Sequence, residues 1–163
     1  EIMPSLVGSE MCIRDSGCSF SLDPQHLNVL APGKKPFHTL NPALARLKDG
    51  RTMVYGTMGG DGQPQTQAAV FTRYAVFGQA VQQAITAPRW LLGRTWGQSS
   101  DSLKLESRFA PEIIDGLRKL GHEVDVIAEF DEMVGHAAAI VRDADGIFAG
   151  GFDPRSNGIA AGF

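Results

Sequence analysis

Cysteine, histidine clusters and metal-binding patterns are scarce in this chain. It contains only two cysteines, Cys12 and Cys18, both near its start. Two neighbouring cysteines are too few for a disulfide framework, and no CxxC or Cys/His spacing typical of zinc occurs. The four histidines are scattered along the chain. We therefore expect neither a metal nor another cofactor.

A strong charge and a long apolar run are also missing. The net charge is -3 over 163 residues, which gives no basic field of the kind that a nucleic-acid binder needs. No apolar run approaches the roughly 20 residues of a membrane span. We expect one domain that binds neither nucleic acid nor, through this chain, the interior of a membrane.

The first residues are unlike a natural N-terminus. The chain opens on Glu1, and PSLVGSEMCIRDS lacks the basic start and apolar core of a signal peptide. This string resembles translated sequencing-adapter read-through, while a genuine flexible arm is the alternative. We predict that residues 1-16 are adapter-derived or disordered, and that the protein proper begins near Gly17.

Glycine, by contrast, is abundant, and its most informative cluster is GTMGGDGQPQ, from Gly56 to Gln65. The pair Gly59 and Gly60 separates a strand-like run from a helix-like run. Glycines there allow close approach of the backbone to a ligand, and a helix N-terminus favours an anion. The pair therefore predicts an electrophile-stabilising site, although it could also serve only a tight turn.

The rest of the pattern predicts an α+β fold. Proline-rich loop is expected from Gly17 to Asn41, and Asp49-Gly50 and Asp145-Gly146 are typical hairpin turns. Antiparallel hairpins are expected in place of repeated βαβ units. The expected strands are Ala43–Leu47, Thr52–Thr57, Leu103–Glu106, Glu123–Glu129, Ala137–Arg142 and Ile147–Gly150, and the expected helices are Gln65–Gly78, Gln79–Thr86 and Pro111–Leu120.

Several short motifs in a fixed order resemble one known family. They are PGKKPFHTLNP, a hairpin, GTMGGDGQPQ, ITAPRW, LKLE, Gly121-His122 and FDPRSNGIAAGF. Their order and spacing resemble the C-terminal part of the small subunit of γ-glutamyltransferases (γ-glutamyltranspeptidases, glutathione hydrolases). The resemblance covers residues 17-163 and points to a divergent branch of that family.

The resemblance implies an N-terminal nucleophile (Ntn) hydrolase with a four-layer αββα sandwich, present here only as a C-terminal fragment. Members cleave themselves from a proenzyme into two subunits. A new N-terminal threonine then attacks the amide carbonyl of a γ-glutamyl substrate such as glutathione, with its own α-amine as base. The acyl group passes to water, an amino acid or a peptide. The missing large-subunit portion would be the partner of this chain.

Site residues follow from the resemblance position by position. Gly59 and Gly60 match the glycine pair of the family's oxyanion hole. His38 and Thr39 stand where many members have a Ser-Ser pair that binds the substrate's α-carboxylate. Ser19 stands near the position where the family has an acidic residue that binds the glutamyl amine. A serine cannot supply that negative charge. The differences from the family at His38 and Ser19 put the identity of the acyl group in question.

Other matching positions suggest structural roles. Arg89 follows Pro88 as in the family's APR motif, and bracing of the fold by an ion pair is the favoured interpretation. Asp153 and Arg155 match a DPR signature, for which we expect a turn with an Asp–Arg contact. Glu106 ends a predicted strand and is also expected to be structural. Trp90 and Trp96 receive no role.

The attacking threonine has no counterpart in this chain, so we expect the chain alone to be inactive. The large subunit and the first strands of the small one are also missing, so we expect exposed sheet edges and apolar faces to make the isolated chain poorly stable. Three interpretations stay open. The chain is a fragment of a γ-glutamyltransferase-like enzyme, a fragment of an Ntn amidase or acylase for another acyl group, or a non-catalytic module that binds an anion at Gly59-Gly60.

Overall fold

The computed structural model describes residues 17, 19–93 and 100–162. The chain divides into two compact units, residues 1–40 and residues 41–163. Residues 19–40 follow turns and loop around one isolated bridge between Ser21 and Val29, in agreement with the predicted proline-rich loop. The predictions for residues 1-16 and for Trp96 fall outside the described residues.

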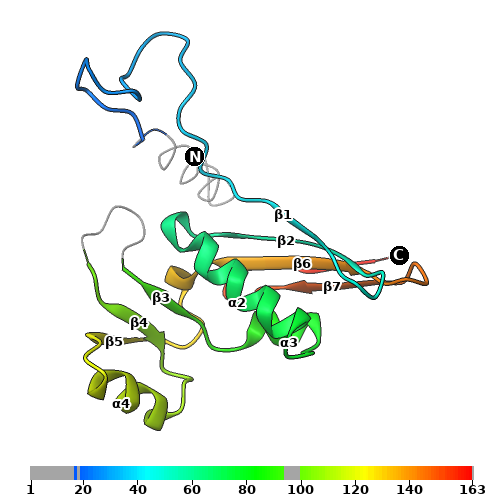
Figure 1. Ribbon diagram of the computed structural model, residues 1–163. Coiled ribbons are helices and arrows are strands. Elements are labelled where there is room, and N and C mark those ends of the chain that lie inside the picture. Colours follow the sequence, from blue (N-terminus) through cyan, green and yellow to red (C-terminus); the bar gives the residue numbers. More distant parts are fainter. Residues whose placement is uncertain (1–16, 18, 94–99, 163) are drawn as a thin grey trace. The chain divides into compact units, whose positions relative to one another are not determined.

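A four-stranded antiparallel sheet forms the centre of the second unit (Figure 1). Its spatial order is β1-β2-β6-β7. Both predicted hairpin turns are present, with Gly50 at φ 89° and Gly146 at φ 90°, values that glycine adopts at little cost. The four strands are β1 (Ala43–Arg46), β2 (Thr52–Met58), β6 (His136–Arg142) and β7 (Phe148–Phe152).

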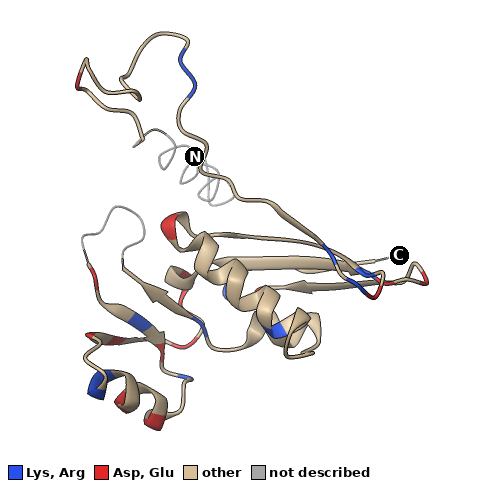
Figure 2. Ribbon diagram, viewed as in Figure 1, with Lys and Arg blue, Asp and Glu red and all other residues tan. Residues whose placement is uncertain are grey.

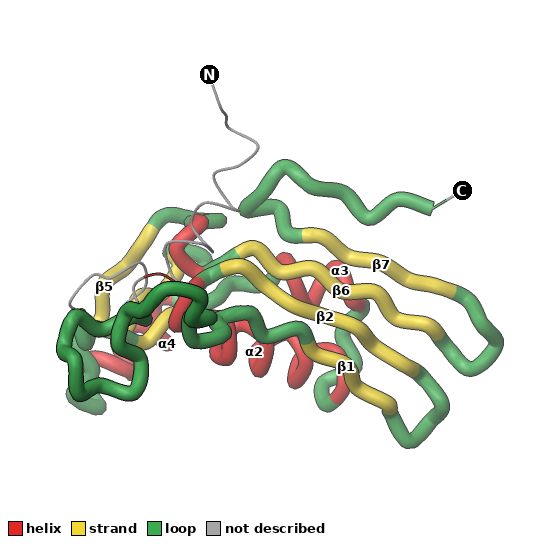
Figure 3. The backbone as a smooth tube through the Cα atoms, turned by 90° about the horizontal axis from the view of Figure 1, so that it is seen from above, coloured by secondary structure: helices red, strands yellow, loops and turns green. Residues whose placement is uncertain are grey.

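Two helices, α2 (Gln63–Ala75) and α3 (Val81–Thr86), cover one face of this sheet (Figure 3). Alternate residues of β2 and β6 point toward them, because successive side chains of a strand face opposite sides. Met53 and Ile85 are fully buried in the resulting core. Helix α3 approaches β7 closely because Gly151 has no side chain: a Cβ there would lie 2.9 Å from Ile85 Cδ1.

The two ends of α2 differ from the predicted ones. Helix α2 begins two residues before the predicted Gln65 and ends at Ala75, before the predicted Gly78. Val76 and Phe77, which were expected on a buried helix, are 68% and 72% exposed. Their apolar character continues the helical pattern, but α2 ends before them and both are mostly exposed in the described structure.

A second, three-stranded sheet contains one antiparallel and one parallel strand pair. It contains β3 (Trp90–Leu92), β4 (Leu103–Glu106) and β5 (Val124–Ile127), in the order β3-β4-β5. Strands β4 and β5 are parallel, and α4 (Pro111–Lys119) forms the crossover between them. This is a single βαβ unit, whose strands and helix were predicted but whose parallel pairing was not. Strand β3 was not predicted at all, and Trp90 pairs there with Leu105.

The second sheet also buries a charged side chain. Lys104 on β4 is 5% exposed. Its ammonium donates to Gly93 O at 2.6 Å, Ser100 Oγ at 2.7 Å and Ser102 O at 3.3 Å. A lysine ammonium has three hydrogens, and each one has an acceptor. The ammonium therefore links Gly93, which follows β3, to Ser100 and Ser102, which precede β4.

Charged residues gather on α4 and at the turns, while the four-stranded sheet and α2 carry few (Figure 2). Among the described residues, none of the helices is sufficiently long and apolar to cross a membrane.

Candidate functional site

The glycine pair lies where the sequence places it, between the end of β2 and the start of α2. A single 3₁₀ turn, η2 (Gly60–Gly62), joins the two elements. Gly59 has φ 148° and ψ 21°, and Gly60 has φ 51°. Gly59 is buried and adopts a backbone conformation that other residues rarely reach, so the sharp turn depends on glycine there.

The start of α2 has no side-chain cap. Its N-cap position is Gly62, whose N–H donates to Gly59 O at 2.9 Å, and a proline follows in the first turn. Gly62 is also required by packing, since a Cβ there would lie 2.8 Å from Leu91 Cδ1. A helix start that is capped by backbone alone leaves its positive end next to the glycine turn. This arrangement can stabilise an anion.

His136 is a second polar group near this turn, and the sequence prediction missed it. In the β2–β6 register it pairs with Met58, the residue before Gly59. Its Nε2 is buried and has no hydrogen-bond partner in the described residues. Burial lowers the pKa of His136, which keeps the ring neutral near pH 7. The signal in the sequence was the Gly135-His136 pair immediately before an apolar strand.

A buried ion cluster at the C-terminal end of α3 connects residues of the two sheets. Glu106 at the end of β4 accepts two hydrogen bonds of 2.6 Å from Arg155, one at each carboxylate oxygen. Asp153 accepts from Arg155 at 3.0 Å and from Arg89 at 2.5 Å. The predicted Asp–Arg contact of the DPR motif and the bracing role of Arg89 are therefore present. Arg108 adds a contact of 2.8 Å to Glu106.

The arginines of this cluster also serve the C-terminal end of α3, whose last carbonyls have no partner within the helix. Arg89 and Arg155 both donate to Ile85 O at 3.2 Å. Arg108 donates to Thr86 O at 2.8 Å, and Arg155 reaches Ala87 O at 3.2 Å. Positive groups are favourable at this negative end of a helix. The APR and DPR motifs thus act together as a cap for α3.

The pKa values in the cluster follow from burial and pairing. Burial lowers the pKa of Arg89 to about 10, so the guanidinium stays protonated at neutral pH. Burial alone would raise the pKa of Glu106, but hydrogen bonds from Arg155 and from the N–H of Arg89 outweigh it and lower the pKa. These groups therefore hold fixed charges near pH 7 and are structural.

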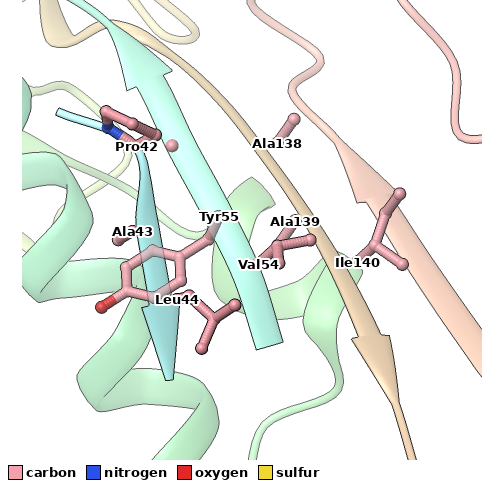
Figure 4. Close-up of a pocket in the computed structure, with 9 residues that line it drawn as sticks. Pro42, Ala43, Leu44, Val54, Tyr55, Ala138, Ala139 and Ile140 are labelled. Carbon is pink, nitrogen blue, oxygen red and sulfur yellow. The ribbon is translucent and has the colours of Figure 1, made fainter. Parts of the chain in front are cut away.

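The sheet face opposite α2 and α3 carries an open apolar hollow of about 500 Å³ (Figure 4). Leu44, Val54 and Ile140 stand in one row across β1, β2 and β6, and they are 63%, 44% and 49% exposed. Apart from the hydroxyl of Tyr55, the residues that line the hollow have no polar or charged side-chain group. The lining residues are Pro42, Ala43, Leu44, Val54, Tyr55, Gly56, Ala138, Ala139 and Ile140. Its character suits packing against another apolar surface.

His38 and Thr39 belong to the first unit, residues 1–40, whereas Gly59 and Gly60 belong to the second. Their assignment to substrate binding stays a prediction, as does that of the glycine pair to catalysis. Thr57 and Thr66 flank the glycine turn, and each donates its hydroxyl to a backbone carbonyl, Met58 O at 2.6 Å and Val134 O at 2.9 Å respectively. Among the described residues, no group of three or more acidic, histidine or cysteine side chains forms a metal site.

The sheets, helices and glycine turn define a part of an N-terminal nucleophile hydrolase of the α+β class. This chain resembles cephalosporin acylase from Bacillus halodurans with a TM-score of 0.71 and 32% identity, over 90% of this chain and 26% of that one. The chain belongs to the gamma-glutamyltranspeptidase family, whose model matches residues 10–163.

Two proenzymes of known name are similar in sequence to most of this chain. The chain is 69% identical over 150 residues to the oxamate amidohydrolase proenzyme of Klebsiella pneumoniae. It is 46% identical over 150 residues to the glutathione hydrolase-like YwrD proenzyme of Bacillus subtilis. In both comparisons 92% of this chain is covered, but only 28% and 29% of the relative. The chain thus spans less than a third of the proenzymes that it matches.

Proposed function

We propose that this chain is the oxyanion-stabilising part of an Ntn amidohydrolase proenzyme that cleaves a small amide through a threonyl acyl-enzyme. The observation that carries the proposal is the Gly59–Gly60 turn, whose glycine-dependent backbone lies at the start of α2, where no side chain caps the helix. The family match supports the reaction class. The nucleophilic threonine comes, in this proposal, from the portion of the proenzyme outside this chain.

The reaction needs three groups. The threonine oxygen attacks the amide carbonyl carbon, and the threonine α-amine takes the hydroxyl proton. The carbonyl oxygen becomes an oxyanion, which backbone N–H groups of the glycine turn stabilise. The C–N bond then breaks, the nitrogen leaves with the proton held by the α-amine, and water hydrolyses the ester. Of these three groups, only the third, the backbone N–H groups that stabilise the oxyanion, is assigned to this chain.

The substrate that we propose first is oxamate, the amide of oxalate, because 69% identity to an oxamate amidohydrolase proenzyme supports it. His38 and Ser19 also support an acyl group other than γ-glutamyl, since they replace residues that bind the glutamyl carboxylate and amine in the family. The second candidate is a γ-glutamyl amide such as glutathione, which the 46% identity to a glutathione hydrolase-like proenzyme favours.

The test compares these substrates in the full-length proenzyme after maturation. Ammonia release from oxamate and nitroaniline release from γ-glutamyl-p-nitroanilide are measured side by side. We expect turnover of oxamate and little turnover of the γ-glutamyl amide. Turnover of the γ-glutamyl amide alone would replace the first substrate by the second. Turnover of neither, by fully matured protein, would contradict the amidohydrolase proposal.

We further propose that the apolar face around Leu44, Val54 and Ile140 packs against the rest of the same proenzyme. An antiparallel sheet commonly has one face on the core and one in water, and the water-facing side is then polar. Here both faces are apolar, as in a sheet that is buried between two layers. This chain covers less than a third of the proenzymes that it matches, which supports a further layer formed by the rest of such a proenzyme.

A further inference from the structure

A third glycine, Gly135, lies directly against the glycine turn. It joins the 3₁₀ turn η3 (Glu132–Val134) to β6 and is buried, with φ 84°. A Cβ at Gly135 would lie 2.3 Å from Met58 O and 2.7 Å from Thr57 Oγ1. The first distance is far inside van der Waals contact with backbone, so any side chain at Gly135 would push the end of β2 away.

The contact is reciprocal. A Cβ at Gly59 would lie 3.3 Å from the Cα of Gly135. Two chain segments that are distant in sequence therefore pass each other backbone to backbone at the level of the glycine turn. The position of Gly59 is thus set from one side by Gly135.

Gly135 itself is held by hydrogen bonds on both sides. Its own carbonyl accepts a hydrogen bond from Arg89 Nη2. The preceding carbonyl, Val134 O, accepts from Thr66 Oγ1 at 2.9 Å, and Ala137 N donates to Asp153 Oδ2 at 2.6 Å. The three side chains are 0%, 3% and 1% exposed for Arg89, Thr66 and Asp153. Thr66 also belongs to α2, which begins at the glycine turn.

We propose that Gly135 is a positioning residue that sets the place of the Gly59–Gly60 turn, and that Arg89 and Asp153 hold Gly135 in turn. The inference rests on the proposed function, since it gives the turn an oxyanion to stabilise. It assigns the buried ion cluster a second task besides capping α3. Rate depends on such placement, because a displacement of about 1 Å in an active site can cost roughly 100-fold.

The experiment uses the full-length proenzyme and oxamate, with kcat expressed per matured subunit as counted on a denaturing gel. Gly135→Ala is compared with Gly121→Ala. Gly121 has a similar φ of 93°, but a Cβ there meets nothing within 4 Å. Both variants carry the same kind of backbone strain, and only Gly135→Ala displaces the turn. We expect Gly135→Ala to lower kcat about 10- to 100-fold with KM within about threefold of wild type, and Gly121→Ala to leave both unchanged.

Gly59→Ala separates the two claims. Loss of kcat in both Gly59→Ala and Gly135→Ala supports both. Loss in Gly59→Ala with wild-type kcat in Gly135→Ala overturns the positioning role and leaves the proposed function standing. Wild-type kcat in Gly59→Ala overturns the proposed function of the turn itself.

Should Gly135→Ala fail to mature, Arg89→Lys decides. This variant keeps the positive charge and the glycine but removes the forked guanidinium that reaches Gly135 O and Asp153 together. We expect kcat per matured subunit to fall about 3- to 10-fold at unchanged KM. An unchanged kcat overturns the inference.

Discussion

At the scale of residues, Glu106 and Arg155 form a buried ion pair with two hydrogen bonds. Both side chains are fully buried, and they share two hydrogen bonds of 2.6 Å. Arg108 also contacts Glu106, and its guanidinium carbon lies 3.8 Å from the centroid of the Phe130 ring. Phe130 adopts φ 55°, which costs a non-glycine residue energy that this contact helps to offset. Removal of the Glu106 charge leaves the carboxylate of Asp153 as the remaining buried partner of Arg89 and Arg155, so positive charge in the cluster is no longer balanced.

Glu106→Gln is therefore expected to lower the free energy of unfolding by about 3–5 kcal/mol. Asp115→Asn is the matched control, because its partner Arg118 lies 3.6 Å away and both side chains are about half exposed. The control should cost less than about 1 kcal/mol. Urea unfolding of the full-length protein measures both, and equal losses would contradict the buried-cluster account.

His136 gives a pH dependence with a definite sign. Burial lowers its pKa first, Asp153 and Glu132 oppose that effect, and Arg89 and Arg155 reinforce it. The unfolded histidine binds a proton as the pH falls through about 6.5, whereas the folded one does so only at lower pH. Its contribution to stability is therefore present above pH 6.5 and is lost as the pH falls below it.

His136→Gln should accordingly flatten the fall in stability between pH 7 and pH 5, by at most about 1.4 kcal/mol per pH unit. The measurement is the urea midpoint across this range for wild type, His136→Gln and His122→Gln, the last at an exposed histidine of the same unit. An unchanged slope in His136→Gln would show that burial of this ring does not govern the acid sensitivity.

At the scale of elements, much of the architecture was readable from local signals. Asp49-Gly50 and Asp145-Gly146 predicted their hairpins because only glycine suits the required φ. Strand Leu103–Glu106 was placed correctly. Local patterns do not reveal which strand pairs with which, so the parallel pairing of β4 with β5 was missed. Strand β3 was too short to show a period.

The same limit explains what was predicted of the site. The pair Gly59-Gly60 was visible because two adjacent glycines stand out beside a strand and a helix. Gly135 was missed because its role depends on a contact with a segment that is distant in sequence. Arg89 and Asp153 were recognised as structural by resemblance, but their shared grip on the end of α3 is a tertiary arrangement that spacing cannot encode.

Helix α4 provides a test of the element scale. Gly116 lies within it, and a Cβ there would meet nothing within 4 Å. Gly116→Ala should therefore stabilise the protein by about 0.5–1 kcal/mol, because alanine loses less backbone entropy in a helix. Gly121→Ala should destabilise by about 1 kcal/mol, since the residue after this helix has φ 93°. Thermal unfolding of both variants checks the signs, and a destabilising Gly116→Ala would contradict the assigned helix.

At the scale of the whole molecule, the proposal that the apolar sheet face packs against the rest of a proenzyme can be tested by substitution. Ile140 on this face and Ile113 on α4 are each 49% exposed. If the face packs against another layer, Ile140→Asp should reduce soluble, matured full-length protein about tenfold or more, because a buried unpaired charge is costly. Ile113→Asp should leave the yield near wild type. Equal yields for the two variants would contradict the buried-face proposal.

The central proposal is that the glycine turn binds and stabilises the oxyanion. The most direct measurement is kcat for oxamate in the matured full-length enzyme carrying Gly59→Ala, with Gly121→Ala as control. Because φ 148° is strained for a residue with a side chain and a Cβ would lie 3.3 Å from Gly135 Cα, we expect alanine to displace the turn. A fall in kcat of about 100-fold, at nearly unchanged KM and with an unaffected control, is the predicted result. A wild-type kcat in Gly59→Ala would contradict the claim.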